Sequence, residues 1–268
     1  MSAGAVRRLK IVFVTPEEPS VMPIFFERVI AAIPDEVAAV AVVSPIYKNS
    51  SWSKQAKRFI DAFGWREFIV EAACFGYYKV ADVARRYLRV GHYHSVKSIA
   101  RSHSLRLLTP ASVNGAEFLD ELREIDPDVV ISVSCPQIFG KELLQLPRAG
   151  CINVHSALLP HYRGMLPTFW ALARGERQTG VSVHYMTPGI DGGDIIVRKT
   201  IPITDHETLH SLMRKCKQVA AEAILETVSQ VRAGHVTVAP NPPEEGSYFS
   251  FPAREDVRQF KALGRRLR

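Results

Sequence analysis

The sequence predicts an α/β fold with a doubly wound, mostly parallel sheet and a short C-terminal helical extension. Apolar, β-branched runs of strand length alternate with helical segments through about residue 150, which is the order typical of βαβ units. The 268 residues are 47% hydrophobic and 23% charged, the composition of a globular chain. These observations predict a Rossmann-like architecture, whose sites lie at the carboxyl ends of its strands.

The first half of the predicted sheet is made of runs that are apolar on both faces, as in buried parallel strands. These runs are residues 9–14, 37–43, 105–109 and 128–134. Helices are expected near 23–33, through most of 54–106, and at 112–124. Pro34 and the Asp126-Pro127 step end the first and the last of these helices, and residues 44–53 are expected to form a loop.

The second half of the chain continues with shorter elements. Strands are predicted at 151–155, 181–186 and 195–201, and helices at 138–146, 167–174 and 208–233. Residues 240–251 are rich in proline and expected to be extended, and 254–268 form a basic helix. We therefore expect one main domain over 1–205, with a helical insertion at about 54–106, and a C-terminal helix with a basic tail, 206–268, packed on it.

The formal net charge of +7 comes from 34 Lys and Arg against 27 Asp and Glu. No zinc-finger or RRM pattern accompanies the basic stretches, so a nucleic-acid partner is not expected. No apolar run reaches the roughly 18 residues of a membrane span, and the first ten residues lead into no long apolar segment. The expectation is a cytoplasmic protein that does not enter a membrane and keeps its four widely spaced cysteines reduced.

Polar residues that could carry chemistry follow two predicted strands. Asn153 and His155 are two residues apart in a strand and therefore share a face. Asp191 lies in the turn Gly189-Ile190-Asp191-Gly192-Gly193-Asp194. An amide can donate to an oxygen that gains charge, an imidazole can exchange a proton, and a carboxylate can orient the imidazole. Each piece also fits a structural role, and their joint occurrence is what indicates an active site.

Other chemistries find less support in the sequence. The chain lacks the GxGxxG and GxxxxGK[ST] patterns that bind nucleotide phosphates. Ser156 has no GxSxG elbow, and Cys135 and Cys151 lie in apolar strands. His92 and His94 have no spaced carboxylate or cysteine partner, so no metal is expected.

The runs CINVHSALLPHYRGMLP and GVSVHYMTPGIDGGDII resemble the formyltransferase family, most clearly over residues 128–201. The resemblance implies that Asn153, His155 and Asp191 are catalytic and that His184 supports Asp191. It also implies N10-formyltetrahydrofolate as the formyl donor, without a metal. The pterin would lie between two walls, one of Gln137, Ile138, Phe139 and Leu144 and the other of Met186, Thr187, Pro188, Gly189 and Ile190.

The acceptor follows less directly from the resemblance. Methionyl-tRNA formyltransferases have an additional C-terminal barrel, and the length after residue 205 suits only a helix and a tail, so tRNA is disfavoured. We expect a primary amine on a small molecule, with a nucleotide-linked amino sugar as the best candidate and Tyr162, Arg163 and Trp52 as candidate contacts. A tRNA acceptor, hydrolysis of formyltetrahydrofolate, a non-catalytic binding role and a homodimer stay open. The insertion could be a lid or a dimer surface.

Overall fold

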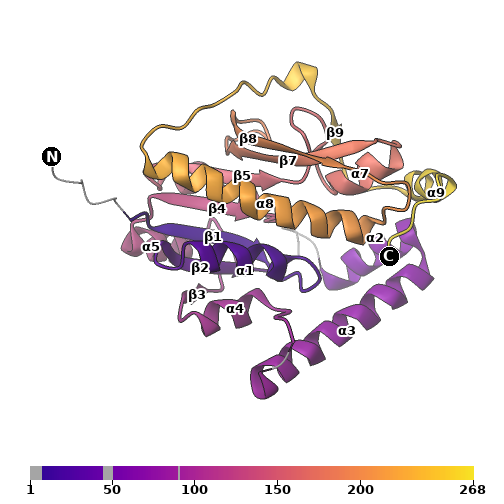
Figure 1. Ribbon diagram of the computed structural model, residues 1–268, viewed down its shortest axis with the longest axis horizontal. Helices are drawn as coiled ribbons and strands as arrows, with labels where there is room; N and C mark the ends of the chain where they lie inside the picture. The colour runs from indigo at the N-terminus through magenta and orange to yellow at the C-terminus, as the bar shows by residue number, and fades with distance from the viewer. Residues whose placement is uncertain (1–7, 45–50, 90) are drawn as a thin grey trace.

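The protein is built on one seven-stranded sheet, seen in a computed structural model that describes residues 8–44, 51–89 and 91–268 (Figure 1). The strand order is β3-β2-β1-β4-β5-β7-β8. The strands are β1 (Ile11–Pro16), β2 (Val37–Val43), β3 (Arg106–Leu108), β4 (Val129–Val133), β5 (Cys151–His155), β7 (Gln178–Tyr185) and β8 (Ile195–Pro202). The first five in this order are parallel, and β7 and β8 continue antiparallel. The predicted doubly wound, mostly parallel sheet is confirmed.

Helices cover both faces of the sheet. α1 (Met22–Ala32) and α8 (Leu209–Arg232) lie side by side on one face, while α5 (Ala116–Ile125) and α6 (Lys141–Gln145) lie on the other (Figure 1). Thr208 and Ser211 form a reciprocal capping box that starts α8, satisfying backbone N–H groups that the first turn cannot pair. Two apolar clusters, one on each side of the sheet, form the core.

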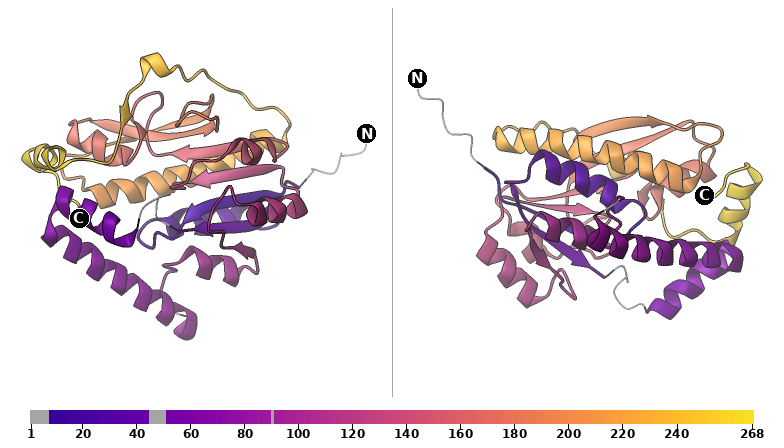
Figure 2. Two further views of the ribbon diagram at one scale, coloured as in Figure 1. Left: turned by 180° about the vertical axis from the view of Figure 1, so that it is seen from behind. Right: turned by 60° about the horizontal axis from the view of Figure 1, so that its bottom comes forward.

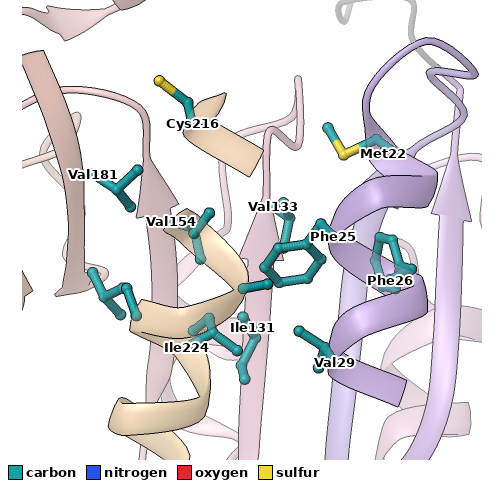
Figure 3. Packing of buried hydrophobic residues seen from close by; sticks show 14 of the residues in the cluster. Met22, Phe25, Phe26, Val29, Ile131, Val133, Val154, Val181, Cys216 and Ile224 are labelled. Atoms are coloured by element: carbon teal, nitrogen blue, oxygen red, sulfur yellow. The ribbon is translucent and has the colours of Figure 1, made fainter. Parts of the chain in front are cut away.

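The larger cluster joins α1, α8 and the central strands. In Figure 3, Phe25 of α1 points toward Ile131 and Val133 of β4, Phe26 lies on the side of α1 away from them, and α8 contributes Ile224 opposite α1. Phe25 and Phe26 also meet edge to face, with ring centroids 5.1 Å apart, a favoured aromatic geometry. This packing fixes the carboxyl ends of β1, β4 and β5 relative to one another.

The predicted helical insertion consists of α2 (Trp52–Phe63), α3 (Trp65–Leu88) and α4 (Val96–Ser102). Ser51 caps α2 by accepting a hydrogen bond from the Lys54 N–H. Gly64, at φ +97°, makes the sharp turn from α2 to α3, a conformation that favours glycine. The insertion lies at the lower edge of the molecule in Figure 1, and α3 runs along the side turned forward in the right panel of Figure 2.

The chain after α8 returns across the molecule. It makes a 3-10 turn, η1 (Pro243–Glu245), and a short strand, β9 (Tyr248–Phe249), before α9 (Arg254–Ala262). β9 pairs in parallel with β6 (Arg163–Gly164), just before α7 (Pro167–Ala173). α9 packs against α2 and α7 (Figure 1), so the C-terminal segment borders both the site and the insertion.

Several predicted boundaries differ from the structure. The helix predicted at 138–146 is confined to α6, because residues 138–140 are extended and Asn114 hydrogen-bonds the Ile138 carbonyl and the Gly140 N–H. The predicted helix at 254–268 ends at Ala262, and Gly264 follows at φ +73°. The loop predicted at 44–53 lies partly outside the described residues.

The division of the chain into 1–205 and 206–268 stays a prediction. α8 shares one continuous core cluster with α1 and the strands. Among the described residues, no helix is both long enough and apolar enough to cross a membrane.

Candidate active site

A cleft of about 560 Å³ opens at the carboxyl ends of β1, β4 and β5. The strand order reverses between β1 and β4, so this is the position where α/β sheets of this topology bind ligands. Both polar and apolar side chains line the cleft. They include Glu17, Glu18, Ser134, Cys135, Gln137, Ile138, Asn153, His155, Met165, Leu166, Ile190, Asp191, Met213, Lys217 and Tyr248.

The structure brings the three predicted catalytic residues together. β5 presents Asn153 and His155 to the cleft, and the loop between β7 and β8 brings Asp191 against both. Asn153 Nδ2 donates to Asp191 Oδ1 at 3.2 Å and lies 3.2 Å from His184 Nε2. His155 Nδ1 faces Asp191 Oδ2 at 3.6 Å. Asp191 is thus the carboxylate that the amide and the imidazole share.

The orientation of His155 is set by its other ring nitrogen. Nε2 lies 2.8 Å from the backbone carbonyl of Tyr162, and a carbonyl can only accept, so Nε2 carries the proton. In the neutral ring, Nδ1 then holds a lone pair directed at Asp191. A proton taken up at Nδ1 would be stabilised by the carboxylate 3.6 Å away.

The Asp191 carboxylate is held by backbone as well as side chains. The Gly164 N–H donates to Asp191 Oδ2 at 2.8 Å, and Asp191 itself adopts φ +48°, in the left-handed region that non-glycine residues rarely occupy. Gly193 fits close behind: a Cβ there would lie 2.1 Å from the Tyr185 carbonyl oxygen. The Asp-Gly-Gly turn is therefore required for close packing against β7.

Burial and charge shift the two titratable members of the trio in a consistent way. Burial lowers the pKa of His155, and the nearby Asp191 carboxylate and Tyr162 carbonyl only partly oppose this. Burial alone would raise the pKa of Asp191, but His155, His184 and the Gly164 N–H together hold it below its ordinary value. The site therefore pairs an ionised carboxylate with an imidazole that is neutral at neutral pH.

His184 lies beneath the trio, as the resemblance implied. It is buried on β7, opposite Asn153 in the sheet register. Its Nδ1 lies 2.8 Å from the Tyr185 carbonyl and its Nε2 lies 3.6 Å from Asp191 Oδ1. The ring thus fills the space between Asn153 and the Asp191 loop.

Asn241 is a buried residue that sequence analysis missed. Its Nδ2 donates to the carbonyls of Asp191 and Gly193, each at 2.9 Å. Its Oδ1 accepts from Arg163 Nη2 at 2.7 Å. Asn241 lies between two prolines, far along the chain from the residues it holds, and no local pattern could have revealed this role.

Lys217 of α8 is a second residue that sequence analysis missed. It is buried, lines the cleft, and donates from Nζ to Ser134 Oγ at 2.8 Å. Burial lowers the pKa of Lys217 and raises the pKa of Glu18, which faces it. The charge of each residue partly offsets the effect of burial on the pKa of the other. A signal was available, because Lys217 interrupts the apolar face of the predicted helix at 208–233.

The predicted pterin walls are placed unevenly. Gln137, Ile138 and Ile190 line the cleft, and the two isoleucines are large exposed apolar side chains. Phe139 is buried in the core behind the sheet, and Leu144 and Met186 pack against the same cluster. Thr187, Pro188 and Gly189 lie beside the Asp191 turn and outside the residues that line the cleft.

The predicted acceptor contacts all point elsewhere. Tyr162 donates its hydroxyl to Glu176 and stacks on Phe249, and Arg163 is buried against Asn241. Trp52 lies at a separate hollow between α2 and α3. Tyr162 and Arg163 do not reach the cleft because the backbone at 162–163 turns their side chains toward β9. Trp52 does not reach it because it belongs to α2.

The cysteines do not carry the chemistry of a nucleophile. Burial raises the pKa of Cys135 to about 11 and that of Cys151 to about 12, so both thiols stay protonated at neutral pH. Residues 8–44, 51–89 and 91–268 contain no cluster of three or more His, Cys, Asp or Glu side chains placed to hold a metal ion.

Comparison with known proteins assigns the family. The family model described as "Formyl transferase" matches residues 79–228, more than half of the chain. The chain therefore belongs to the formyl transferase family, as the sequence resemblance indicated.

The curated relatives include two methionyl-tRNA formyltransferases. The one from Geobacter sulfurreducens is 41% identical over 139 residues, covering 52% of this chain and 44% of the relative. The one from Caldanaerobacter subterraneus subsp. tengcongensis is 35% identical over 164 residues, covering 61% of this chain and 53% of the relative. The chain thus spans about half the length of these relatives.

Solved structures of similar fold have lower identity. A sugar N-formyltransferase from a Shewanella species has a TM-score of 0.58 at 17% identity, covering 95% of this chain and 87% of that chain. Glycinamide ribonucleotide transformylase 1 from Symbiobacterium toebii has a TM-score of 0.59 at 15% identity, covering 88% and 99%. An N-formyltransferase from Helicobacter canadensis, solved with folinic acid and dTDP-3-aminofucose, has a TM-score of 0.56 at 17% identity, covering 91% and 71%. At these identities the likeness concerns the fold.

Proposed function

We propose that this protein is an N-formyltransferase that moves a formyl group from N10-formyltetrahydrofolate to a primary amine of a small molecule. The observation that carries the proposal is the contact of Asn153, His155 and Asp191 in one cleft at the switch point of the sheet. Family membership supports the reaction class. The chemistry of the three side chains supports the roles below.

The cleft suits a flat, partly apolar group such as a pterin. Ile138 and Ile190 are both exposed apolar side chains, and both line the cleft. Ligand sites of this size combine apolar walls with a few polar groups, and the segment 134–138 adds backbone donors and acceptors at the end of β4. We therefore assign these walls to the folate and the trio to the transferred group. When bound, N10-formyltetrahydrofolate supplies the formyl carbon.

Asn153, His155 and Asp191 have different roles in proton transfer and in stabilising charge. Asn153 donates an N–H to the oxygen that gains negative charge, and its present bonds, both at 3.2 Å, are long enough to yield to such an acceptor. His155 is neutral and takes the proton of the attacking amine at Nδ1 as the amine bonds to the formyl carbon. It then gives a proton to the folate nitrogen as the bond between that nitrogen and the formyl carbon breaks. Asp191 stays ionised and stabilises the imidazolium that results.

For the acceptor we propose an amino sugar. Glu17 lines the cleft, and its Oε2 is a buried oxygen that no hydrogen bond satisfies among the residues the structure describes. A buried acceptor of this kind is costly unless a ligand donates to it, and sugar hydroxyl and amino groups are such donors. The nucleotide part of the predicted acceptor has less support, because Lys217 is the one Lys or Arg among the described cleft-lining residues.

A methionyl-tRNA acceptor is the second candidate. It is supported by the 35–41% identity to two methionyl-tRNA formyltransferases over about half their length. The two acceptors differ in size and charge, so one assay separates them.

The test is tetrahydrofolate release from N10-formyltetrahydrofolate with and without amines. The panel holds nucleotide-linked amino sugars, glycinamide ribonucleotide and charged initiator tRNA. Release that depends on an amino sugar is the expected result. Release that depends on initiator tRNA would favour the second candidate, and release without any amine would contradict transfer and indicate hydrolysis.

Two variants distinguish a catalytic role of His155 from a general effect of losing a histidine. His155→Ala is expected to lower turnover by about 10²- to 10⁴-fold, the usual contribution of a general base. His161→Ala is the matched control, because His161 is an exposed histidine in the nearby loop. Near-wild-type turnover by His155→Ala would refute the assigned role.

A further inference from the structure

The outer face of α3 is an apolar surface that no other described part of the chain covers. Of fifteen large hydrophobic side chains exposed among the described residues, ten belong to α2 and α3. Ile69, Val80 and Tyr87 are 61%, 70% and 81% exposed. In α3 as a whole, Asp82 is the one residue that is fully buried within the described part of the chain.

These side chains form a continuous stripe. The apolar residues of the outer face recur every three or four positions, at Trp65, Ile69, Ala72, Val80, Val83 and Tyr87. On a helix with 3.6 residues per turn these positions fall within about 80° of one another. Gly76 lies in the same row, and a Cβ built there meets nothing within 4 Å. The stripe residues Ile69, Val80 and Tyr87 are exposed, and in Figure 1 no other element lies below α3.

Charge is distributed very unevenly around this stripe. Residues 54–106 contain 11 Lys and Arg against 4 Asp and Glu, a surplus of seven, which equals the net charge of the entire chain. The remainder of the chain is balanced, with 23 of each sign. The positive charge of the protein is therefore concentrated on the insertion.

The acidic residues of α3 all turn inward. Glu67 pairs with Lys261 at 3.2 Å, Glu71 pairs with Arg268 at 2.8 Å, and Asp82 accepts from Ser98 Oγ at 2.6 Å. Basic side chains flank the stripe, with Arg66 on one side and Lys79 and Arg86 on the other. Arg66 also pairs with Glu67 at 3.2 Å, and Arg86 with Asp82 at 3.9 Å. The outer face thus presents apolar and cationic groups together.

We infer that the outer face of α3 docks on an anionic lipid bilayer and lies in its interface without crossing it. Interfacial helices combine an apolar stripe, aromatic residues and flanking Lys and Arg, and they sink their apolar face roughly 5–10 Å into the headgroup region. The five large apolar side chains of the stripe are 43–81% exposed, an area of roughly 600 Å², which is at the upper end of the largest patch on a typical monomer. Trp65, Tyr77 and Tyr87 are residue types that favour the membrane interface.

A second copy of the chain fits this face less well. Self-association would bring together two insertions that each carry a surplus of seven positive charges over residues 54–106. Paired helices that pack through an apolar stripe match opposite charges along the edges of that stripe. Among the described residues, the outer face of α3 offers no carboxylate to pair with the basic residues of a second copy. An anionic bilayer supplies the missing negative charge.

The test is flotation of the full chain with vesicles, at 0.1 M NaCl. Vesicles of phosphatidylcholine with one quarter phosphatidylglycerol are compared with vesicles of phosphatidylcholine alone. The expected result is binding to the anionic vesicles and loss of that binding at 1 M NaCl, where the Debye length falls from about 10 Å to about 3 Å. Absence of binding to anionic vesicles at 0.1 M NaCl would overturn the inference.

Two sets of variants assign the binding to α3. The apolar set is Ile69→Gln, Val80→Gln and Tyr87→Gln together, with Val238→Gln and Leu263→Gln as exposed apolar controls outside the insertion. The apolar set is expected to abolish flotation, while the controls bind like wild type. Far-UV circular dichroism and the Tm establish that each variant is folded.

The charge set is Arg66→Gln, Lys79→Gln and Arg86→Gln, and its control is Lys141→Gln, Arg177→Gln and Arg198→Gln, exposed elsewhere. Each basic residue near an anionic surface contributes about five-fold to the partition coefficient, so three substitutions lower it by on the order of 100-fold. Equal loss in the control set would overturn the assignment to α3. Sedimentation velocity measures the oligomeric state. A dimer that the apolar set dissociates, in a protein that binds no vesicles, would also overturn the inference.

Discussion

Asn241 is predicted to hold the Asp191 loop in its reactive position, and Asn241→Ala tests this. The substitution removes two hydrogen bonds to the carbonyls of Asp191 and Gly193 and one from Arg163. A neutral hydrogen bond contributes about 1 kcal/mol and one to a charged group about 1.5–3 kcal/mol. Since Asn241 is buried, we expect the free energy of unfolding to fall by about 3–5 kcal/mol, measured by urea denaturation.

Turnover should respond to the same change because Asp191 is then free to move. A displacement of about 1 Å at a reacting group can cost about 100-fold in rate, and we expect a loss of that order in kcat for Asn241→Ala. Asn241→Asp keeps an acceptor for Arg163 but loses both donors. Its second carboxylate oxygen would face the carbonyl oxygens of Asp191 and Gly193, so this variant should lose turnover as Asn241→Ala does.

Asn114→Ala provides the matched control for stability. Asn114 also makes two hydrogen bonds to backbone, with Ile138 and Gly140, but in an exposed setting. Its loss should cost only about 1 kcal/mol, because water can replace the missing partner. An Asn241→Ala protein that unfolds within 0.5 kcal/mol of wild type and keeps its kcat would refute this reasoning.

The remaining predictions concern acid–base behaviour and packing. Because burial lowers the pKa of His155 from its ordinary 6.5, kcat should fall only as the pH drops below 6.5. Asp191→Asn removes the charge that favours the imidazolium and should move this acidic limb of the pH profile to still lower pH; a limb at or above 6.5 would contradict the assignment. Gly193→Ala places a Cβ 2.1 Å from the Tyr185 carbonyl oxygen and should cost about 1–3 kcal/mol of stability, whereas an unchanged urea midpoint would exclude this close packing. Lys217→Met removes the cation that faces Glu18, so the pKa of Glu18, which burial already raises, should rise further. The variant should therefore lose stability as the pH increases from 5 to 8, which Tm measurements would detect. An equal effect of the substitution at both pH values would argue against the pairing.

The sequence could predict the sheet and the grouping of Asn153 with His155 because both depend on local patterns. Apolar strands alternating with helices predict a parallel sheet, and strand alternation alone places Asn153 and His155 on one face. The Asp-Gly-Gly turn pointed to Asp191, the family resemblance supported it, and the structure brings its loop to within 3.6 Å of His155.

The supporting residues could not be predicted because their positions depend on distant packing. Asn241 reaches the site only when the chain after α8 returns across the molecule. Tyr162 and Arg163 follow Asn153 and His155 closely in sequence, yet pairing of β6 with β9 turns their side chains away from the cleft. Phe139 illustrates the same limit, because an apolar residue next to a cleft can face either the ligand or the core, and here it faces the core.

The fate of the formyl group tests the central claim most directly. Mass spectrometry of the reaction with N10-formyltetrahydrofolate and an amino-sugar acceptor measures N-formylated amine and free formate. The account predicts one N-formylated amine for each tetrahydrofolate released, and neither product with His155→Ala. Formate in place of the formylated amine, or equal product from His155→Ala, would contradict it.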